Sequence, residues 1–330
     1  NKVNYWTGQE CRLFEREFAK WCGSKYAVAL ANGTLALEGA LRALNIRAGD
    51  EVVVSPRTFI ASVSCVVNIG ATPVFADVDP HSGNISPETI AKVISPKTRA
   101  IICVHLGGWP CDMDGIMGLA NPRGIKVIED CAQAHGARYK GKSVGTIGHI
   151  GAWSFCQDKI MTTGGEGGLV TTNDESLWRT LWAYKDHGKS YEAVYERNHP
   201  PGFRWLHDSF GSNWRMLEIQ AVIGRIQLKK MTEWTARRNE NALILTKKIS
   251  NLLGPNKLLR YPNFACNLEC SLVNKKCVSK KTGACKHAFY RYYVYLNTQK
   301  LAPGWDQERI IDSIKKAGVP CYSGSCSEVY

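Results

Sequence analysis

Three short segments of the 330-residue sequence carry residues whose types and spacing could do chemistry. In the first, ALANGTLAL at 29–37, a strand pattern ends at Asn32 and a helix pattern begins, with Gly33 and Thr34 at the junction. Backbone N–H groups at such a helix start can bind a phosphate, and Thr34 adds a hydroxyl. Taken alone, an ordinary helix N-cap is the commoner explanation of these residues.

The second segment is VIEDCAQAHG at 127–136, where an apolar strand ends in the carboxylates Glu129 and Asp130. Ligands of open α/β sheets bind beside the carboxyl ends of strands, so an acid at this position could pair with a cationic ring nitrogen. A carboxylate that caps a helix is the simpler alternative.

The third segment, GAWSFCQDKIMTTGGEGGLVTTND at 151–174, places Lys159 after a short apolar strand and before four glycines and Glu166. A lysine in a desolvated site can lose its proton and act as a nucleophile or base. A lysine on a surface loop explains this segment about as well. Together, however, the three segments supply an anion site, an acid for a ring nitrogen and an amine for an imine. Pyridoxal phosphate requires all three groups.

The sequence resembles the DegT/DnrJ/EryC1/StrS family of sugar aminotransferases, within the fold-type I pyridoxal-phosphate enzymes. The resemblance runs from Tyr5 to about Tyr322, nearly the whole chain, and its motifs are specific when they are taken jointly. They are YWTG at 5–8, NGT at 32–34, GDEVVVSPRTF at 49–59, GATPVFADVD at 70–79, IEDCAQAHGA at 128–137, SFCQDKIMTTGGEGG at 154–168 and SNWRMLEIQAVIGRIQL at 212–228.

The resemblance implies a role for each matching residue. Lys159 matches the lysine that forms an imine with pyridoxal phosphate, and Asp130 matches the acid that pairs with the pyridinium nitrogen. Gln133 matches the position that reaches the phenolic oxygen of the cofactor, and Phe59 matches an aromatic ring that stacks on the cofactor. Lys159 and Asp130 are therefore the expected catalytic residues.

By the same resemblance, the phosphate of the cofactor is expected to contact Gly33, Thr34 and Ser154. Asn213 matches an asparagine that reaches the phosphate of the neighbouring subunit's cofactor, so a homodimer with shared active sites is expected. The family's spacing after the lysine is K-x-x-T-T-G-E-G-G, and one extra glycine here leaves Glu166 without an assigned role.

The implied activity is transfer of an amino group, with L-glutamate as the donor, to a nucleotide-diphosphate 3- or 4-keto hexose. Lys185, His187 and Lys189 are candidate contacts to the diphosphate, although a solvated helix end is the commoner role for such residues. Tyr5 and Trp6 could line the sugar pocket or pack in the core. The resemblance leaves open the nucleotide, the aminated carbon and the pathway.

Three other functions compete with the aminotransferase. Relatives that use the cofactor to dehydrate sugars carry His at the lysine position, and Lys159 argues against that chemistry. A catalytically silent sensor or scaffold of the same fold is disfavoured because Lys159, Asp130 and Ser154 are retained together. An NAD-linked sugar dehydrogenase would require the motif G-x-G-x-x-G after the first strand. Residues 30–35 read LANGTL instead, which argues against this function.

The elements that must position these residues alternate between strand and helix patterns in the first half of the chain. Short, nearly continuous apolar strands separated by helices predict an α/β fold with a mainly parallel central sheet, covered by helices on both faces. The runs at 152–155 and 168–172 flank the glycine-rich loop and could pair as a hairpin. Further strands are expected at 26–31, 51–54, 73–76, 100–104 and 126–129, and helices at 35–44, 59–68, 87–93 and 113–119.

Beyond residue 174 the pattern becomes mainly helical. A large α/β cofactor-binding domain at 1–232 and a smaller α+β domain at 233–330 fit this order, with an insertion at about 264–286. The smaller domain is expected to be truncated, because members of the family usually continue for several dozen residues. Helices are expected at 176–184, 215–228, 233–253 and 307–317, and a strand at 289–296.

Composition narrows the possible partners. A formal net charge of +13 favours anionic ligands such as phosphorylated molecules, but no basic helix with interleaved aromatic residues indicates a nucleic-acid partner. No apolar run reaches the roughly 18 residues of a membrane span, and the first residues do not read as a signal peptide. A cytoplasmic protein without a membrane partner is therefore expected.

Nine of the thirteen cysteines lie in apolar segments and are interpreted as small, reduced side chains. The other four, Cys266, Cys270, Cys277 and Cys285, have the spacing C-x3-C-x6-C-x7-C. Four thiolates can close a zinc site, but paired C-x2-C spacing is missing and few apolar residues surround the cluster. We therefore expect a surface insertion without a metal, and expect deletion of residues 266–285 to leave activity largely unchanged.

Overall fold

The central feature of the protein is a seven-stranded sheet with the strand order β1-β9-β8-β5-β4-β2-β3. The computed structural model describes residues 8–202, 204–253, 258–260 and 285–324. β9 is antiparallel to both of its neighbours, and the other adjacent strands run parallel. The strands of this sheet are Tyr26–Leu30 (β1), Glu51–Val54 (β2), Thr72–Phe75 (β3), Thr98–Val104 (β4), Lys126–Asp130 (β5), Ile150–Ser154 (β8) and Gly168–Thr172 (β9).

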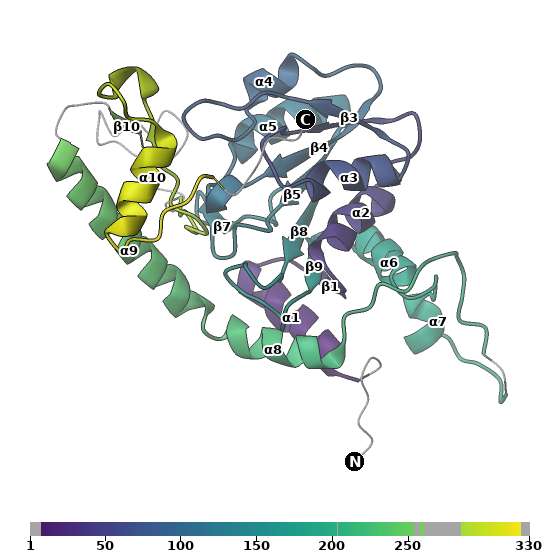
Figure 1. The fold of residues 1–330 in the computed structure, drawn as a ribbon. Coiled ribbons are helices and arrows are strands. Elements are labelled where there is room, and N and C mark those ends of the chain that lie inside the picture. The colour runs from purple at the N-terminus through teal and green to yellow at the C-terminus, as the bar shows by residue number, and fades with distance from the viewer. Residues whose placement is uncertain (1–7, 203, 254–257, 261–284, 325–330) are drawn as a thin grey trace.

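Helices cover both faces of this sheet, as Figure 1 shows. The α-helices of the described residues are Glu10–Cys22 (α1), Gly33–Ala43 (α2), Ala61–Asn68 (α3), Pro87–Ala91 (α4), Met113–Ala120 (α5), Glu175–Tyr184 (α6), Tyr191–Tyr195 (α7), Glu218–Leu228 (α8), Met231–Leu253 (α9) and Gln307–Lys316 (α10), of which α9 and α10 lie away from the sheet. The mainly parallel α/β fold expected from the sequence is confirmed.

The hydrophobic core consists of clusters on the two faces of the sheet, because successive side chains along each strand point to opposite faces. Val52 and Val54 pack with α2, α3 and α6, whereas Val53 packs with α4 and α5 on the opposite face. Side chains of successive strand residues point to opposite faces, so an apolar run buried on both sides supplies both clusters. Near β1, β8 and β9 the second face is covered by α1 and α8, around Phe14 and Phe18.

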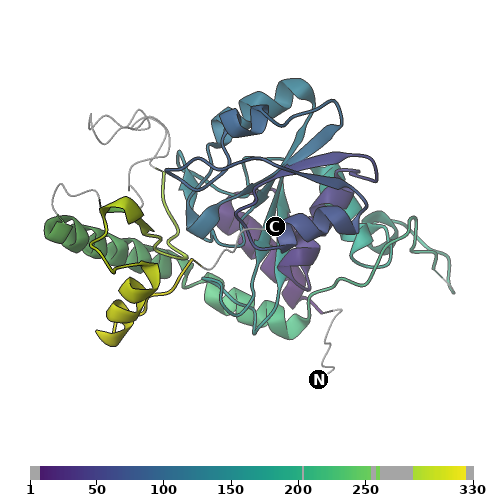
Figure 2. The same ribbon diagram turned by 45° about the horizontal axis from the view of Figure 1, so that its top comes forward.

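The C-terminal elements lie beside α9, which leads away from the sheet (Figures 1 and 2). There a short antiparallel pair joins Leu259–Arg260 (β10) to Tyr295–Leu296 (β11). A second such pair, Arg138–Tyr139 (β6) with Lys142–Ser143 (β7), forms a hairpin outside the main sheet. The division into domains at 232/233 stays a prediction. Within the described ranges, no helix is both long and apolar enough to cross a membrane.

The strand expected at 289–296 is wrong over its first six residues, because only Tyr295–Leu296 is extended and paired. Phe289 has a φ of 50°, in the left-handed region that interrupts a strand. The backbone N–H groups of Ala288 and Arg291 donate to Gly108 and Gly107, so this aromatic segment binds to a loop of the α/β part and not to a neighbouring strand. The hairpin-like pairing of β8 with β9 is confirmed.

Candidate active site

Asp130 lies at the carboxyl end of β5, in the middle of the sheet. Its Oδ2 accepts a hydrogen bond from the Ser62 hydroxyl at 2.8 Å, and its Oδ1 accepts one from the N–H of Ala132 at 3.0 Å. Burial raises the pKa of this carboxyl, while those hydrogen bonds and the positive charge of Lys159 act against the increase. A buried carboxylate of this kind is stabilised by a cation placed beside it, such as a protonated ring nitrogen.

The adjacent carboxylate, Glu129, has a structural role. It accepts hydrogen bonds from three backbone N–H groups of residues 145–148 and lies 3.0 Å from His105 Nε2. Because His105 Nδ1 accepts the N–H of Cys111, Nε2 carries the proton and donates to Glu129. His105, Glu129 and Cys131 are close enough together for a metal site, but these hydrogen bonds already occupy the imidazole and the carboxylate.

The start of α2 meets the end of β8 at Gly33 and Ser154. A Cβ on Gly33 would lie 2.6 Å from the Cβ of Ser154, so only glycine allows this contact. Asn32 Oδ1 caps the N–H of Leu35 at 3.0 Å, and no described residue accepts a hydrogen bond from the N–H of Gly33 or Thr34. The N-terminus of α2, where such N–H groups can bind a phosphate, therefore lies against the Ser154 side chain.

Lys159 follows β8, and its side chain is 16% exposed. Its Nζ lies 3.1 Å from the carboxylate of Asp158 and 5.2 Å from the centre of the Tyr290 ring. Asp130 ends β5 and pairs in register with Ala152 of β8, so Lys159 follows the strand next to the one that ends in Asp130. This pairing of a shielded amine with a buried acid is what a covalently held, cationic ring would use.

The glycine-rich loop after Lys159 is held by α8. The N–H of Thr162 donates to Gln227 Oε1 at 2.9 Å, and Gln220 Nε2 donates to the carbonyl of Glu166 at 2.8 Å. Gly164 and Gly165 have φ values of 88° and 122°, so the lengthened loop needs glycine at these two positions. The Glu166 side chain is exposed, and its role as a catalytic group stays unassigned.

The remaining expected cofactor residues differ in their surroundings. Gln133 Oε1 accepts the N–H of Gly107 at 2.7 Å, and Phe59 is 64% exposed just before α3. Asn213 is exposed, and its backbone forms a bridge with Asp186. No contact among the described residues joins Asn213 to Lys159, Asp130 or the Gly33–Ser154 contact.

The basic residues near the end of α6 do not form one cluster. Lys185 lies 3.9 Å from the buried carboxylate of Glu15, and Lys189 lies 3.3 Å from Asp186, whereas His187 is exposed. Five candidate residues lie outside the described part of the chain: Tyr5, Trp6, Cys266, Cys270 and Cys277. Cys285 is described, and its sulfur accepts the N–H of Lys140 at 3.2 Å.

Three residues that contact the expected catalytic pair were missed by the sequence analysis. Ser62, which donates to Asp130, lies one helical turn after Thr58 in the segment TFIAS. Asp158 directly precedes Lys159, and this adjacency of opposite charges was an available signal. Tyr290 had no local signal, because its contact with Asp158 spans 132 residues of sequence.

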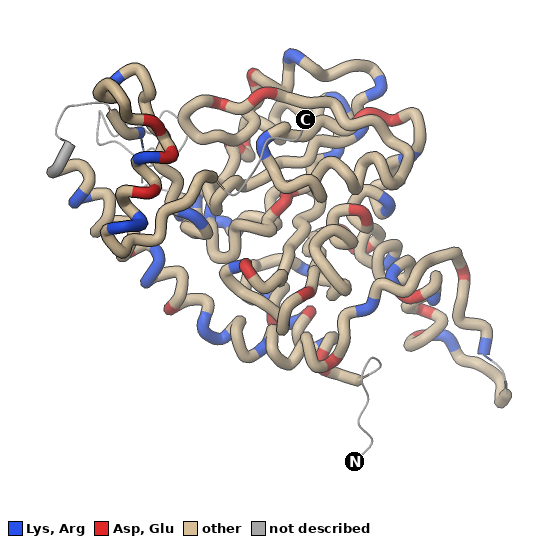
Figure 3. The backbone as a smooth tube through the Cα atoms, in the orientation of Figure 1, with Lys and Arg blue, Asp and Glu red and all other residues tan. Residues whose placement is uncertain are grey.

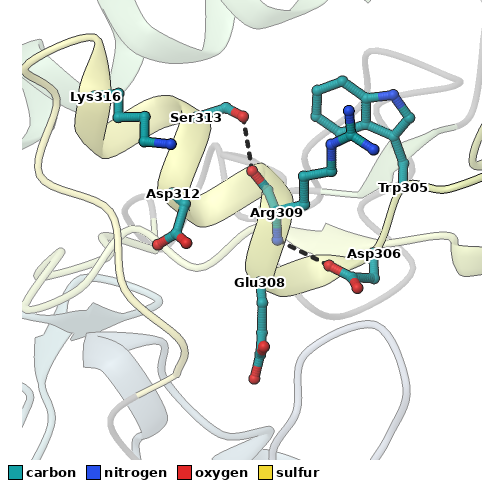
Figure 4. A pocket seen from close by; sticks show the side chains of 7 residues that line it. All are labelled: Trp305, Asp306, Glu308, Arg309, Asp312, Ser313 and Lys316. Atoms are coloured by element: carbon teal, nitrogen blue, oxygen red, sulfur yellow. Dashed lines mark hydrogen bonds between the residues drawn. The ribbon is translucent and has the colours of Figure 1, made fainter.

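A shallow depression on α10 is separate from this chemistry (Figure 4). Its lining comes entirely from one stretch of chain and includes none of the expected site residues. The Arg309 guanidinium lies 4.6 Å over the Trp305 ring, and the backbone N–H of Arg309 donates a hydrogen bond to Asp306 Oδ1. These lining residues therefore interact with one another. The lining residues are Trp305, Asp306, Glu308, Arg309, Asp312, Ser313 and Lys316.

Two characterised relatives match most of the chain but a smaller part of their own length. The GDP-perosamine synthase of Escherichia coli O157:H7 is 44% identical over 250 residues, which are 76% of this chain and 66% of that protein. The UDP-N-acetyl-3-dehydro-alpha-D-glucosamine 3-aminotransferase of Acidithiobacillus ferrooxidans is 43% identical over 235 residues, covering 71% of this chain and 60% of that protein. The chain thus matches less than two thirds of the length of either relative.

Similarity extends over the whole chain in one solved structure and nearly the whole chain in a family model. The crystal structure of an aminotransferase from Psychrobacter cryohalolentis has a TM-score of 0.92 and 62% identity, covering 100% of this chain and 80% of that one. The model of the DegT/DnrJ/EryC1/StrS aminotransferase family matches residues 1–321. This chain therefore belongs to the DegT/DnrJ/EryC1/StrS aminotransferase family.

Proposed function

We propose that the protein is a pyridoxal-phosphate-dependent aminotransferase that moves an amino group from L-glutamate to a nucleotide-diphosphate keto-hexose in amino-sugar biosynthesis. The observation that carries this proposal is that β5 and β8 are neighbouring parallel strands, with a buried acid at the end of β5, a close contact with the start of α2 at the end of β8, and a shielded lysine just after β8. Lys159, Asp130 and the Gly33–Ser154 contact supply these three parts. Family membership and the names of the two relatives support the reaction and the class of substrate.

The site residues fit the cofactor group by group. Lys159 would hold it through the amine, Asp130 would pair with its ring nitrogen, and Gln133 would reach its phenolic oxygen. Phe59 would cover the ring face, where its exposed side chain is available. The cofactor phosphate would be bound at the start of α2, by the backbone and side chains of Gly33, Thr34 and Ser154.

Bound pyridoxal phosphate supplies an electron-accepting ring and carries the amino group between donor and acceptor. Asp130 keeps a proton on the ring nitrogen, because its carboxylate is buried and gains from a cationic partner. Lys159 Nζ, as a free amine, removes and returns a proton at the reacting carbon of each substrate. Glu129 holds the backbone around residues 145–148 and does not touch the reacting atoms.

A homodimer is part of this proposal, with Asn213 acting on the cofactor of the second copy. The exposed position of Asn213 supports a role outside its own site. An apolar stripe on α8 supports a second copy as the partner: Ile219, Val222 and Ile226 are 61%, 38% and 53% exposed at helical spacing. Because α8 also holds the loop after Lys159, pairing through this helix would bring the two sites close together.

We also place the protein in the cytoplasm. Five cysteines of the described ranges are buried as free thiols: Cys22, Cys65, Cys103, Cys111 and Cys131. Reduced thiols are typical of that compartment, where disulfides are rare.

The reaction can be tested by following the amino nitrogen. The purified protein is supplied with pyridoxal phosphate, ¹⁵N-labelled L-glutamate and a panel of 3- and 4-keto hexoses linked to GDP, UDP or dTDP. We expect ¹⁵N in one amino-sugar nucleotide, detected by mass spectrometry, and none with Lys159→Ala. Release of a dehydrated sugar without nitrogen transfer would instead favour the dehydratase, and no change in any sugar would reject both.

A further inference from the structure

Asp158 precedes Lys159 in the chain and also contacts its amine. Both carboxylate oxygens of Asp158 lie 3.1 Å from Lys159 Nζ. The lysine side chain is 16% exposed, and attraction between charges is stronger where water is partly excluded. The free amine of Lys159 therefore has a carboxylate partner that is separate from Asp130.

Tyr290, from the C-terminal part of the chain, fixes this carboxylate. Its hydroxyl donates a hydrogen bond to Asp158 Oδ2, and its ring centre lies 5.2 Å from Lys159 Nζ. Tyr290 is only 7% exposed, so its hydroxyl is held by packing. Although burial acts to raise the pKa of Asp158, the bonds from Tyr290 and Lys159 outweigh it and lower that pKa. The carboxylate thus stays ionised beside the amine.

We propose that Asp158 is a positioning residue whose carboxylate, anchored by Tyr290, holds the free Lys159 amino group at the reaction site. The inference rests on the proposed function only for the catalytic role of Lys159. A proton that Lys159 has taken then stays close to the carbon that must receive it, because the ammonium cannot swing away into water. The proton moves only between the reacting carbon and Lys159 Nζ, as in the proposed reaction. Asp158 neither forms nor breaks a covalent bond.

The contact also links the cofactor site to the C-terminal part of the chain. The N–H of Ala288, two residues before Tyr290, donates to the carbonyl of Gly108. The N–H of the adjacent Gly107 donates to Gln133 Oε1. The segment that carries Tyr290 is therefore bound to the same loop that binds Gln133. A shift of this segment would move the Tyr290 hydroxyl, and with it the carboxylate that orients Lys159.

The test measures how readily the Lys159 amine reacts in the cofactor-free protein. Trace acetic anhydride is applied between pH 6 and 10, and acetylation of the peptide that contains Lys159 is quantified by mass spectrometry. The ion pair with Asp158 makes the amine less available to the reagent, so Asp158→Asn is expected to speed labelling of Lys159 by about threefold to tenfold at pH 8. Tyr290→Phe should give a smaller increase, because the charge remains and only its anchor is lost.

Asp114→Asn is the matched control, since Asp114 pairs with Lys140 outside the site. It should leave the labelling of Lys159 at the wild-type rate. If Asp158 served only to stabilise its loop, Asp158→Asn would lower the melting temperature without changing the rate at which Lys159 is labelled, and the proposal would fail. Wild-type or slower labelling of Lys159 in Asp158→Asn would overturn it as well.

The same preparation separates this inference from the proposed function. After addition of pyridoxal phosphate and borohydride, attachment to Lys159 tests the function independently of Asp158. No attachment in the wild type would reject the proposed function and leave the labelling result intact. Normal attachment with an unchanged labelling profile in Asp158→Asn would reject only the role of Asp158.

Discussion

The two neighbouring carboxylates at the end of β5 show how a single residue's surroundings decide its role. Glu129 receives hydrogen bonds from three backbone N–H groups and His105, so its charge is fully compensated within the protein. Asp130 receives two, and burial raises its pKa. Asp130 has fewer hydrogen-bond donors to compensate its charge, so it is the carboxylate suited to a cationic ligand.

We expect Asp130→Asn to retain the fold and lose most of the activity. The amide is close in size to the carboxylate, and Ser62 and Ala132 can still approach it, but the negative charge beside the cofactor ring is gone. By comparison with oriented carboxylates in other enzymes, kcat should fall roughly 10³-fold, which is about 4 kcal/mol. Steady-state kinetics with the ¹⁵N assay measures this, and near-wild-type kcat would show that another acid supports the ring nitrogen.

His135 is a buried residue that makes the stability of the protein depend on pH. It is buried between Trp153 and Phe155, at 5.4 and 5.5 Å between ring centres, and only the backbone of Ser154 approaches its ring nitrogens, without a well-formed hydrogen bond. Burial lowers its pKa to about 3 from 6.5, with Lys159 and Arg238 acting in the same direction. The unfolded chain therefore takes up this proton first, so stability is complete above pH 6.5 and falls as the pH drops toward 3.

His135→Phe should remove this part of the pH dependence. Between pH 7 and pH 5, the free energy of unfolding of the wild type should fall by about 2 kcal/mol more than that of the variant. Urea titrations of the cofactor-free proteins give both values. Asp130, whose pKa is raised, changes stability in the opposite sense but contributes equally to both proteins, so it cancels in the comparison. Equal acid sensitivity would show that His135 is not the group responsible.

At the scale of elements, local pattern predicted the strands and most helices well. Glu51–Val54 has the expected limits, because an apolar run buried on both faces has few alternatives. The helix Glu10–Cys22 was missed, although Phe14, Phe18 and Cys22 recur every four residues on its buried face. The segment 289–294 has the aromatic content of a strand, but its backbone bonds to a distant loop, which no local pattern reveals.

The candidate site divides in the same way. Motifs located Lys159, Asp130 and the start of α2, because each lies at the junction of a strand and a loop or helix. Hydrogen bonds from Ser62 and Tyr290 join segments 68 and 132 residues apart in sequence, so they depend on the tertiary fold. Sequence reasoning reached the residues expected to touch the cofactor and did not reach those that hold them in place.

The junction of α2 with β8 gives an element-scale prediction. Gly33→Ala would place a methyl group 2.6 Å from Ser154 Cβ, so the helix start must move away from the end of β8. We expect the affinity for pyridoxal phosphate, measured by fluorescence titration, to fall about tenfold or more. Gly118→Ala, in α5 with open space around it, is the matched control and should bind the cofactor normally. Unchanged affinity in Gly33→Ala would show that the cofactor phosphate is not bound at this junction.

At the scale of the whole molecule, charge and apolar surface point to different partners. Lys and Arg positions are distributed over the sheet part and along α9, as Figure 3 shows, and this fits small anionic substrates better than one extended acidic partner. The apolar stripe on α8 instead fits a protein surface. Both features support the proposal of an enzyme that binds phosphorylated molecules and pairs through α8.

Ile226→Lys should therefore disrupt the dimer. Ile226 is 53% exposed at the C-terminal end of the stripe, and a lysine there would bury a charge against the second copy. Analytical ultracentrifugation should show a dimer for the wild type and a monomer for the variant. Val319→Lys, at a similarly exposed position outside α8, should remain dimeric. A wild-type protein that is monomeric and fully active would contradict both the dimer and the shared role of Asn213.

The central claim is that Lys159 holds the cofactor, and borohydride reduction followed by peptide mapping tests it most directly. The protein is incubated with pyridoxal phosphate, reduced to make the linkage permanent, digested and analysed by mass spectrometry. We predict that the pyridoxyl group is found on the peptide that contains Lys159, and that Lys159→Ala carries none while keeping its fold. A pyridoxyl group on another lysine, or none on the wild-type protein, would contradict the assignment of the active site.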